Sequence, residues 1–279
     1  MNFCRLVPSP PLSQYVDFFW YYDDLASDHN REHVLPDGSF ELIINLEDRP
    51  RKLFHRDNAE RYDSFRRAWL SGAQSQYLVI DVLQGASMMG AHFKPGGIAP
   101  FLQCPAGETS ERVTELDAIW GALASELRER LLAAPNPQTK FRMLEQFLLK
   151  RLLSQQRVTN GERRVSWAVQ RFMQQPELQN IGAVAAELGV SHKHFIEQFR
   201  ARVGVTPKLF CRIRRFQQVL AQIGSKGRVE WAGVAYSTGY FDQAHFVHDF
   251  QGFAGLNPTA YLSFRSEYPN FTRAPERNL

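Results

Sequence analysis

Apolar residues recur at helical spacing in the C-terminal part of the chain. Ile181, Val184, Ala185 and Leu188 stand three or four positions apart, and Gly189 follows them. This spacing predicts a short helix with one apolar face. The glycine is suited to end it, because glycine adopts a left-handed backbone without strain.

A second helix is expected directly after this glycine. Ser191 stands where an N-cap acceptor is needed, and Phe195, Phe199 and Val203 then repeat every four residues to form one apolar stripe. Gly204 stops the pattern. Two helices joined by a tight turn that contains glycine form a helix-turn-helix unit.

The same unit recurs about fifty residues later. With an offset of 50 or 51 residues, the recurring pairs are Val184 and Val234, Ala185 and Ala235, Gly189 and Gly239, Phe195 and Phe246, Phe199 and Phe250, Gly204 and Gly255, and Pro207 and Pro258. Asp242 is the expected cap of the second copy's second helix. Residues 207–223 predict a connecting helix of about sixteen residues, which would span ~24 Å and hold the copies apart.

Duplication changes what the pattern means. A single pair of short amphipathic helices fits two roles equally well: packing elements of an α-helical domain, or a DNA-binding unit. Two copies at one spacing suit a protein that meets successive faces of a duplex, whose groove returns every ~34 Å.

The N-terminal part shows a different pattern. Residues 34–46, 77–83 and 87–93 are short runs rich in strand-forming residues, and Pro and Gly clusters separate them. Apolar residues at helical spacing follow at 116–132 and 141–153. A β-rich fold followed by two helices is expected. These helices would either form a homodimer face or cover the β-rich part, and the apolar stripe suits both.

Length and composition fit two ordinary domains. The chain has 279 residues, of which 44% are hydrophobic and 22% charged. No apolar run approaches the ~20 residues that cross a bilayer, and no secretory leader is evident, so we expect a cytoplasmic protein without a membrane segment. Three widely spaced cysteines, Cys4, Cys104 and Cys211, predict free thiols.

Charge is unevenly distributed. Residues 1–160 carry 18 Lys and Arg against 20 Asp and Glu, whereas residues 161–279 carry 15 against 9. A basic C-terminal part behind an acidic N-terminal part favours contact with a polyanion through the C-terminal part.

The C-terminal motifs together resemble the DNA-binding domain of the AraC family of bacterial transcription regulators. The matching segments are Ile181-Gly-Ala-Val-Ala-Ala-Glu-Leu-Gly-Val-Ser, Phe195-x3-Phe199, Gly204-x2-Pro207-x2-Phe210, Arg215, Val234-Ala-Tyr-Ser-Thr-Gly-Tyr, Phe246-x3-Phe250 and Gly255-Leu-Asn-Pro258-x2-Tyr261. The resemblance implies a regulator that binds double-stranded promoter DNA sequence-specifically. It leaves open whether the protein is an activator or a repressor, and RNA polymerase is a candidate partner.

Outward-facing residues of the two second helices are the expected DNA contacts. They are His192, Lys193, Ile196, Glu197 and Arg200 in the first copy, and Gln243, His245 and His248 in the second. The family motif adds Arg215, in the expected connecting helix, as a further candidate. Lys193 can donate to guanine edges, and Arg200 suits phosphate. Glu197 replaces an Arg that is frequent in the family, so it either accepts from a cytosine amine or is simply solvated.

The second copy departs further from the family. Residues 229–264 contain three acids and no Lys or Arg, whereas residues 176–228 contain nine Lys and Arg against three Glu. Family members commonly carry Arg and Lys where this chain has His248 and Gln251. We therefore expect the first copy to dominate affinity.

The N-terminal part resembles the cupin-like sensing domains that precede this DNA-binding domain. The matching segments are Pro11-Leu-x2-Tyr-Val-x3-Trp20, Leu35-Pro-Asp-Gly38 and Phe93-Lys-Pro-Gly-Gly97. The resemblance implies a small-molecule effector and a homodimer. The candidate effector-binding residues are Trp20, Tyr22, His33, Trp69 and His92. The aromatic run of residues 18–22 is also consistent with alternating core packing.

Enzymatic alternatives have weaker support. His29-Asn-Arg-Glu-His33 matches an inverted zinc-peptidase pattern, but Pro36-Asp-Gly38 follows at once, and the pattern needs a helix. No catalytic residue, metal ligand or cofactor is expected. One rival remains, a metal-dependent cupin-type enzyme with a DNA-targeting module, which would use His33, His55 or His92. Another is a regulator that answers only to protein partners.

The predicted fold class is therefore α+β. We expect an N-terminal β-rich, cupin-like sensing or dimerisation domain (1–153, with helices at about 116–132 and 141–153), a linker (154–162), an all-α domain of two tandem helix-turn-helix units joined by a long helix (163–264), and a tail (265–279).

Overall fold

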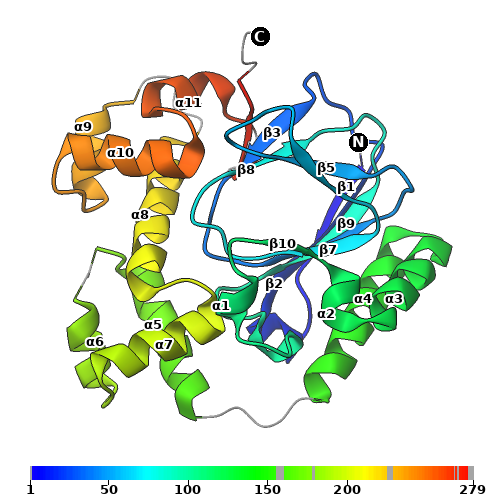
Figure 1. The fold of residues 1–279 in the computed structure, drawn as a ribbon, viewed down its shortest axis with the longest axis horizontal. Helices are drawn as coiled ribbons and strands as arrows, with labels where there is room; N and C mark the ends of the chain where they lie inside the picture. Colours follow the sequence, from blue (N-terminus) through cyan, green and yellow to red (C-terminus); the bar gives the residue numbers. More distant parts are fainter. Residues whose placement is uncertain are drawn as a thin grey trace.

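The computed structural model describes residues 2–154, 160–177, 180–224, 229–266, 268 and 270–275, which form a β domain packed against a helical domain (Figure 1). Among these residues, no helix has both the length and the apolar character needed to cross a bilayer. Cys4, Cys104 and Cys211 form no disulfide.

Two antiparallel sheets build the β domain. The larger sheet has the strand order β1 (Asn2–Leu6), β2 (Val16–Asp23), β9 (Met88–Phe93), β4 (Glu41–Asn45), β7 (Ala68–Ser71) and β10 (Val113–Glu115). The smaller sheet has the order β11 (Phe271–Arg273), β3 (Arg31–Val34), β8 (Leu78–Asp81), β5 (Arg51–Phe54) and β6 (Tyr62–Phe65). The expected β-rich N-terminal fold is confirmed.

Alternation along β2 shows how the larger sheet divides its faces. Phe19 and Tyr21 belong to the main core, whereas Trp20 and Tyr22 pack with residues of both sheets in a second cluster. Successive side chains of a strand point to opposite faces, so the aromatic run serves two cores at once.

Helices cover the outer face of the larger sheet. The short elements of this domain are η1 (Leu12–Gln14), η2 (Ala99–Phe101), α1 (Ala106–Thr109) and α2 (Leu116–Trp120), and the longer ones are α3 (Ala122–Ala133) and α4 (Pro137–Leu153). Leu127 and Leu131 of α3 and Leu144 and Leu148 of α4 join the core of the sheet. The apolar stripes therefore cover the sheet, the second of the two expected roles.

The boundaries of these helices differ from the expected ones. The single helix expected at 116–132 is interrupted at Gly121, whose φ is +61°. The helix expected at 141–153 starts earlier, because the Asn136 side chain caps it by accepting from the Thr139 amide at 2.9 Å.

The helical domain contains both predicted helix-turn-helix units. Its helices are α5 (Asn160–Gln174), α6 (Ile181–Glu187), α7 (His192–Val203), α8 (Pro207–Ile223), α9 (Trp231–Ser237), α10 (Gln243–Ala254) and α11 (Pro258–Phe264). The first unit is α6–α7, and the second unit is α9–α10. Ser191 accepts from the His194 amide, and Asp242 accepts from the His245 amide, so both expected caps are confirmed. At 17 residues, α8 is about 26 Å long.

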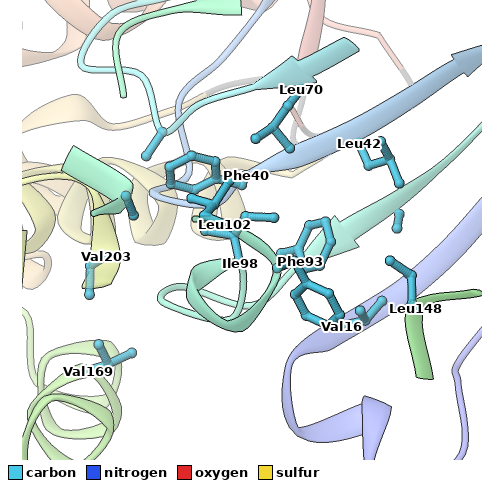
Figure 2. Close-up of a cluster of buried hydrophobic side chains, with 14 of the residues drawn as sticks. Val16, Phe40, Leu42, Leu70, Phe93, Ile98, Leu102, Leu148, Val169 and Val203 are labelled. Atoms are coloured by element: carbon cyan, nitrogen blue, oxygen red, sulfur yellow. The ribbon is translucent and has the colours of Figure 1, made fainter. Parts of the chain in front are cut away.

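The two domains share one core. Phe40, Ile98 and Leu102 of the β domain belong to the same cluster as Val169 and Val203 of the helical domain (Figure 2). A core that crosses the domain boundary fixes how the two domains sit against each other.

The C-terminal segment expected as a tail contributes a strand. β11 pairs with β3, with Thr272 opposite His33, and Thr272 is fully buried. Residues 267, 269 and 276–279 of the expected tail lie outside the described residues. The linker expected at 154–162 overlaps the start of α5, which already includes residues 160–162, and residues 155–159 lie outside the described residues.

Candidate nucleic-acid interface

Helix α7 presents a polar outer surface. Phe195, Phe199 and Val203 are fully buried on its inner side. The sequence-predicted contacts lie elsewhere on the helix: His192, Lys193, Glu197 and Arg200 are exposed, and Ile196 is half-buried. The fold thus brings these five candidates together on one helix, with Lys193 in its first turn.

Helix α10 repeats this arrangement with different chemistry. Phe246 and Phe250 are fully buried. Gln243 and His248 are exposed, and the side chain of His245 is 41% exposed. The outer surface of α10 can therefore donate and accept hydrogen bonds, but it carries no Lys or Arg.

An internal ion pair uses an arginine of α8. Asp249 of α10 is 1% exposed, and its Oδ1 lies 2.6 Å from Nη2 of Arg212 on α8. This pair joins α8 to α10. It also neutralises a charge that would otherwise be available to a phosphate.

Arg215 lies on the buried side of α8, apart from the exposed candidate contacts, and its expected contact with DNA stays a prediction. Its side chain is 1% exposed, Nη1 donates to the Gly239 carbonyl at 3.1 Å, and the guanidinium lies 4.8 Å from the centre of the Tyr240 ring. Arg215 ties α8 to the turn of the second unit. The helical spacing held the signal, because Cys211 and Val219, four positions away on either side, are also buried.

The β domain contacts the first unit through α1. A Cβ atom on Gly107 would lie 3.1 Å from Cγ of Arg200. At Gly204, which ends α7 with a φ of +96°, a Cβ atom would lie 2.2 Å from Oγ of Ser110. The C-terminal end of α7 is therefore packed against the β domain without spare room.

A second contact reaches the end of α10. Nδ1 of His33 lies 3.0 Å from the Ala254 carbonyl oxygen, and the His33 ring stacks on Tyr77 with 4.3 Å between ring centres. A Cβ atom on Gly255 would lie 2.5 Å from Tyr77. His33, predicted as an effector residue, thus lies at the junction between the domains.

A third contact joins the β domain to α8. The Leu35–Gly38 segment, identified in the sequence as part of the cupin-like resemblance, supplies backbone acceptors. Gln217 donates to the Pro36 carbonyl at 2.8 Å, and Arg214 donates to the Asp37 carbonyl at 3.3 Å. The β domain therefore touches both units and the helix that connects them.

Three of the remaining effector candidates gather between the sheets. Trp20 and Tyr22 stack with 5.8 Å between ring centres, and Trp69 belongs to the same cluster. Burial raises the pKa of Tyr22 to about 12, and its hydroxyl lies 2.9 Å from Sδ of Met88. These side chains form an apolar wall. The buried Arg51–Asp81 ion pair lies beside it, since Arg51 also approaches Met88.

His92 is held between two carboxylates. Its Nδ1 lies 2.5 Å from Glu41, and its Nε2 lies 3.3 Å from Asp37. Burial alone would lower the pKa of His92, but the charge of Glu41 and hydrogen bonds to both carboxylates raise it well above its usual value. Trp20 donates its indole N–H to Glu41, so His92 is connected to the aromatic wall.

Two hollows and two exposed aromatic residues belong to the second unit. The hollows have volumes of about 580 and 350 Å³, and Trp231 and Gln243 line both. Tyr236 is 85% exposed and Phe241 is 94% exposed. The sequence analysis did not identify these aromatic residues. Their position outside the apolar stripe of the second unit was the available signal that they are exposed.

The three histidines that the metal-dependent alternative would use are not gathered around a common centre. His33 lies at the domain junction, His92 lies between Asp37 and Glu41, and His55 lies 3.6 Å from Asp63. Glu32 and His33 lie on strand β3 rather than on the helix that the zinc-peptidase pattern needs. In the part of the chain that the structure describes, no three His, Cys, Asp or Glu side chains are placed to hold a metal ion.

Comparison with known families agrees with this geometry. A helix-turn-helix domain family matches residues 184–263, which include α7, α8, α9 and α10 with the AraC motifs. The chain therefore contains an AraC-type helix-turn-helix domain. Its N-terminal residues 4–115 match a domain family of unknown function, DUF6597.

No curated protein sequence matches this chain. Among solved structures, it is similar to unsaturated fatty acid-bound ToxT from Vibrio cholerae, at 11% identity over 93% of this chain and 94% of that chain, with a TM-score of 0.45. Another crystal structure of ToxT from Vibrio cholerae is 10% identical over 94% of this chain and 98% of that chain, with a TM-score of 0.45. The AraC-like transcriptional activator CuxR gives 14% identity, 74% coverage of each chain and a TM-score of 0.23.

Proposed function

We propose that this AraC-type regulator inserts α7 and α10 into two adjacent major grooves of promoter DNA. The observation that carries the proposal is the position of the two units, which pack against the same helix, α8, with their buried stripes inward and their polar surfaces outward. A rigid connecting helix of about 26 Å suits two units that meet one face of a duplex.

The two units contribute unequally in this proposal. Binding to DNA is driven largely by neutralising phosphates with Lys and Arg. Lys193 and Arg200 offer this charge on α7, whereas α10 offers only neutral or weakly basic groups. The first unit therefore supplies most of the affinity, and the second unit adds base contacts through Gln243, His245 and His248.

The β domain modulates this binding when a small molecule or a partner occupies it. A connected set of interactions supports this role: Trp20 donates to Glu41, Glu41 and Asp37 hold His92, and the Asp37 backbone accepts from Arg214 of α8. A ligand that binds one arrangement of the aromatic wall better than another shifts this contact with α8. Contacts with RNA polymerase and a second copy of the chain remain predictions.

A salt-dependent binding titration tests the proposed function. A preferred duplex is selected from a random pool with the full chain, and its affinity is then measured at several salt concentrations. We expect the logarithm of the affinity to fall linearly with the logarithm of the salt concentration. If no duplex is enriched and binding does not depend on salt, the proposed function is refuted.

A further inference from the structure

Phe241 stands out within the second unit. Its side chain is 94% exposed, and it lies in the turn between α9 and α10. The residues on either side have structural roles. Tyr240 is only 5% exposed and its ring packs against Phe246, and the Asp242 side chain caps α10. Phe241 is thus the turn residue whose side chain points to solvent.

This position is where a helix-turn-helix unit meets base edges. The N-terminal residues of a recognition helix contact the bases, and Phe241 directly precedes the cap of α10. Gln243 and Ala244, the first two residues of the helix, are exposed next to it. Together they form a small surface of one aromatic ring, one amide and one methyl group.

The electrostatics of this unit leave room for an apolar contact. Residues 229–264 carry no Lys or Arg, and Asp249 already binds Arg212. Charge therefore contributes little to holding the second unit on DNA. In the major groove, the apolar feature that identifies a base pair is the C5-methyl group of thymine, and phenylalanine is among the side chains that contact it.

We propose that Phe241 packs against a thymine methyl group and makes the second unit selective for thymine at one operator position. The inference rests on the proposed function, because it requires α10 to enter the major groove. It assigns the specificity of the second unit to an apolar contact, in contrast to the charged contacts of α7.

A thymine-to-deoxyuridine exchange tests this contact, because it removes only the methyl group. The probe is the duplex selected by the full chain, with each thymine of the second half-site replaced in turn. We expect one replacement to weaken wild-type binding about fourfold, the effect of one buried methyl group. Phe241→Ala should weaken binding to the original duplex and abolish the response to that replacement.

Matched variants distinguish the contact from general effects. Phe241→Leu keeps an apolar side chain and should retain part of the deoxyuridine response. Lys193→Ala should reduce the slope of log affinity against log salt but keep the full loss of affinity on deoxyuridine replacement. Phe241→Ala should leave that slope unchanged. Tyr62→Ala, at an exposed aromatic residue on β6, should bind as the wild type does. Thermal unfolding confirms that each variant is folded.

Two results would overturn the inference while leaving the proposed function intact. In one, Phe241→Ala responds to every deoxyuridine replacement as the wild type does. In the other, the variant binds DNA normally but fails to regulate transcription, which would place a protein partner on Phe241. If the wild-type chain shows no salt-dependent binding, the proposed function itself fails.

Discussion

We predict that the DNA affinity of the first unit depends most on Lys193. It is exposed in the first turn of α7, where a cation can reach a guanine edge or a phosphate. His248 is exposed on the outer surface of α10. The two residues therefore offer a direct comparison of the two units.

We predict that Lys193→Ala lowers affinity for the selected duplex by about tenfold, because it removes one charged contact. It should also reduce the slope of log affinity against log salt by about 1. His248→Ala should cause a smaller loss and a smaller change in slope. Equal or reversed losses, measured at one salt concentration, would refute the ranking of the two units.

Arg215 shows why a family motif does not reveal a residue's role by itself. The family motif suggested a DNA contact, yet Arg215 lies on the buried side of α8 and donates to the Gly239 carbonyl. Hydrophobic periodicity reported the correct face of the helix. A charged residue is usually exposed, but the packing of α8 against the second unit buries Arg215.

At the scale of elements, the helix-turn-helix units could be predicted because their signals are local. Ser191 and Asp242 each cap a helix by accepting from the backbone amide three residues ahead. Gly189 and Gly239, in the two turns, have φ values of +67° and +76°. Each signal depends on neighbours within a few residues. The strand β11 could not be predicted, because three residues carry too little pattern and its partner, β3, is distant in sequence.

Two glycines of the helical domain offer opposite outcomes for the same substitution. We predict that Gly204→Ala destabilises the protein by about 2–3 kcal/mol, because a Cβ atom would collide with Ser110 and Phe40 at a φ of +96°. Gly252→Ala, within α10 and with open space around it, should stabilise the protein by up to ~1 kcal/mol.

Urea unfolding of the full chain measures both effects. A loss of stability in Gly204→Ala alone would support tight packing of α7 on the β domain. If Gly204→Ala is as stable as the wild type, the contact between α7 and the β domain described here is incorrect.

At the scale of the whole molecule, the β domain holds both units and α8. Sequence reasoning gave two domains but not this arrangement, because periodicity shows which face is buried and not what covers it. The candidate effector residues illustrate the limit. Trp20, Tyr22 and Trp69 meet between the sheets, whereas His33 lies against α10. Only the three-dimensional fold separates them.

The His92 cluster makes the stability of this arrangement depend on pH. Because the pKa of His92 is raised in the folded protein, protonated His92 stabilises the fold. This stabilisation is fully present at a pH below 6.5, the ordinary pKa of histidine, and is lost as the pH rises through the raised pKa. For Asp37, burial alone would raise the pKa, but hydrogen bonding and charge from His92 lower it. Its contribution is therefore full above 3.8 and is lost as pH falls further.

We predict that His92→Gln lowers stability by roughly 2 kcal/mol, because it leaves two carboxylates without their cation. The difference from the wild type should be largest between pH 3.8 and 6.5 and should shrink above the raised pKa of His92. Urea unfolding across this range measures it. His55→Gln, at a more exposed histidine, is the control. A difference that grows at alkaline pH would contradict the assignment.

The central claim is that both units bind the same duplex side by side. Hydroxyl-radical footprinting of the full chain on the selected duplex tests it most directly. We predict two protected segments on one face of the DNA, with centres about one helical turn, or ~10.5 base pairs, apart. A single protected segment at saturating protein would contradict the claim.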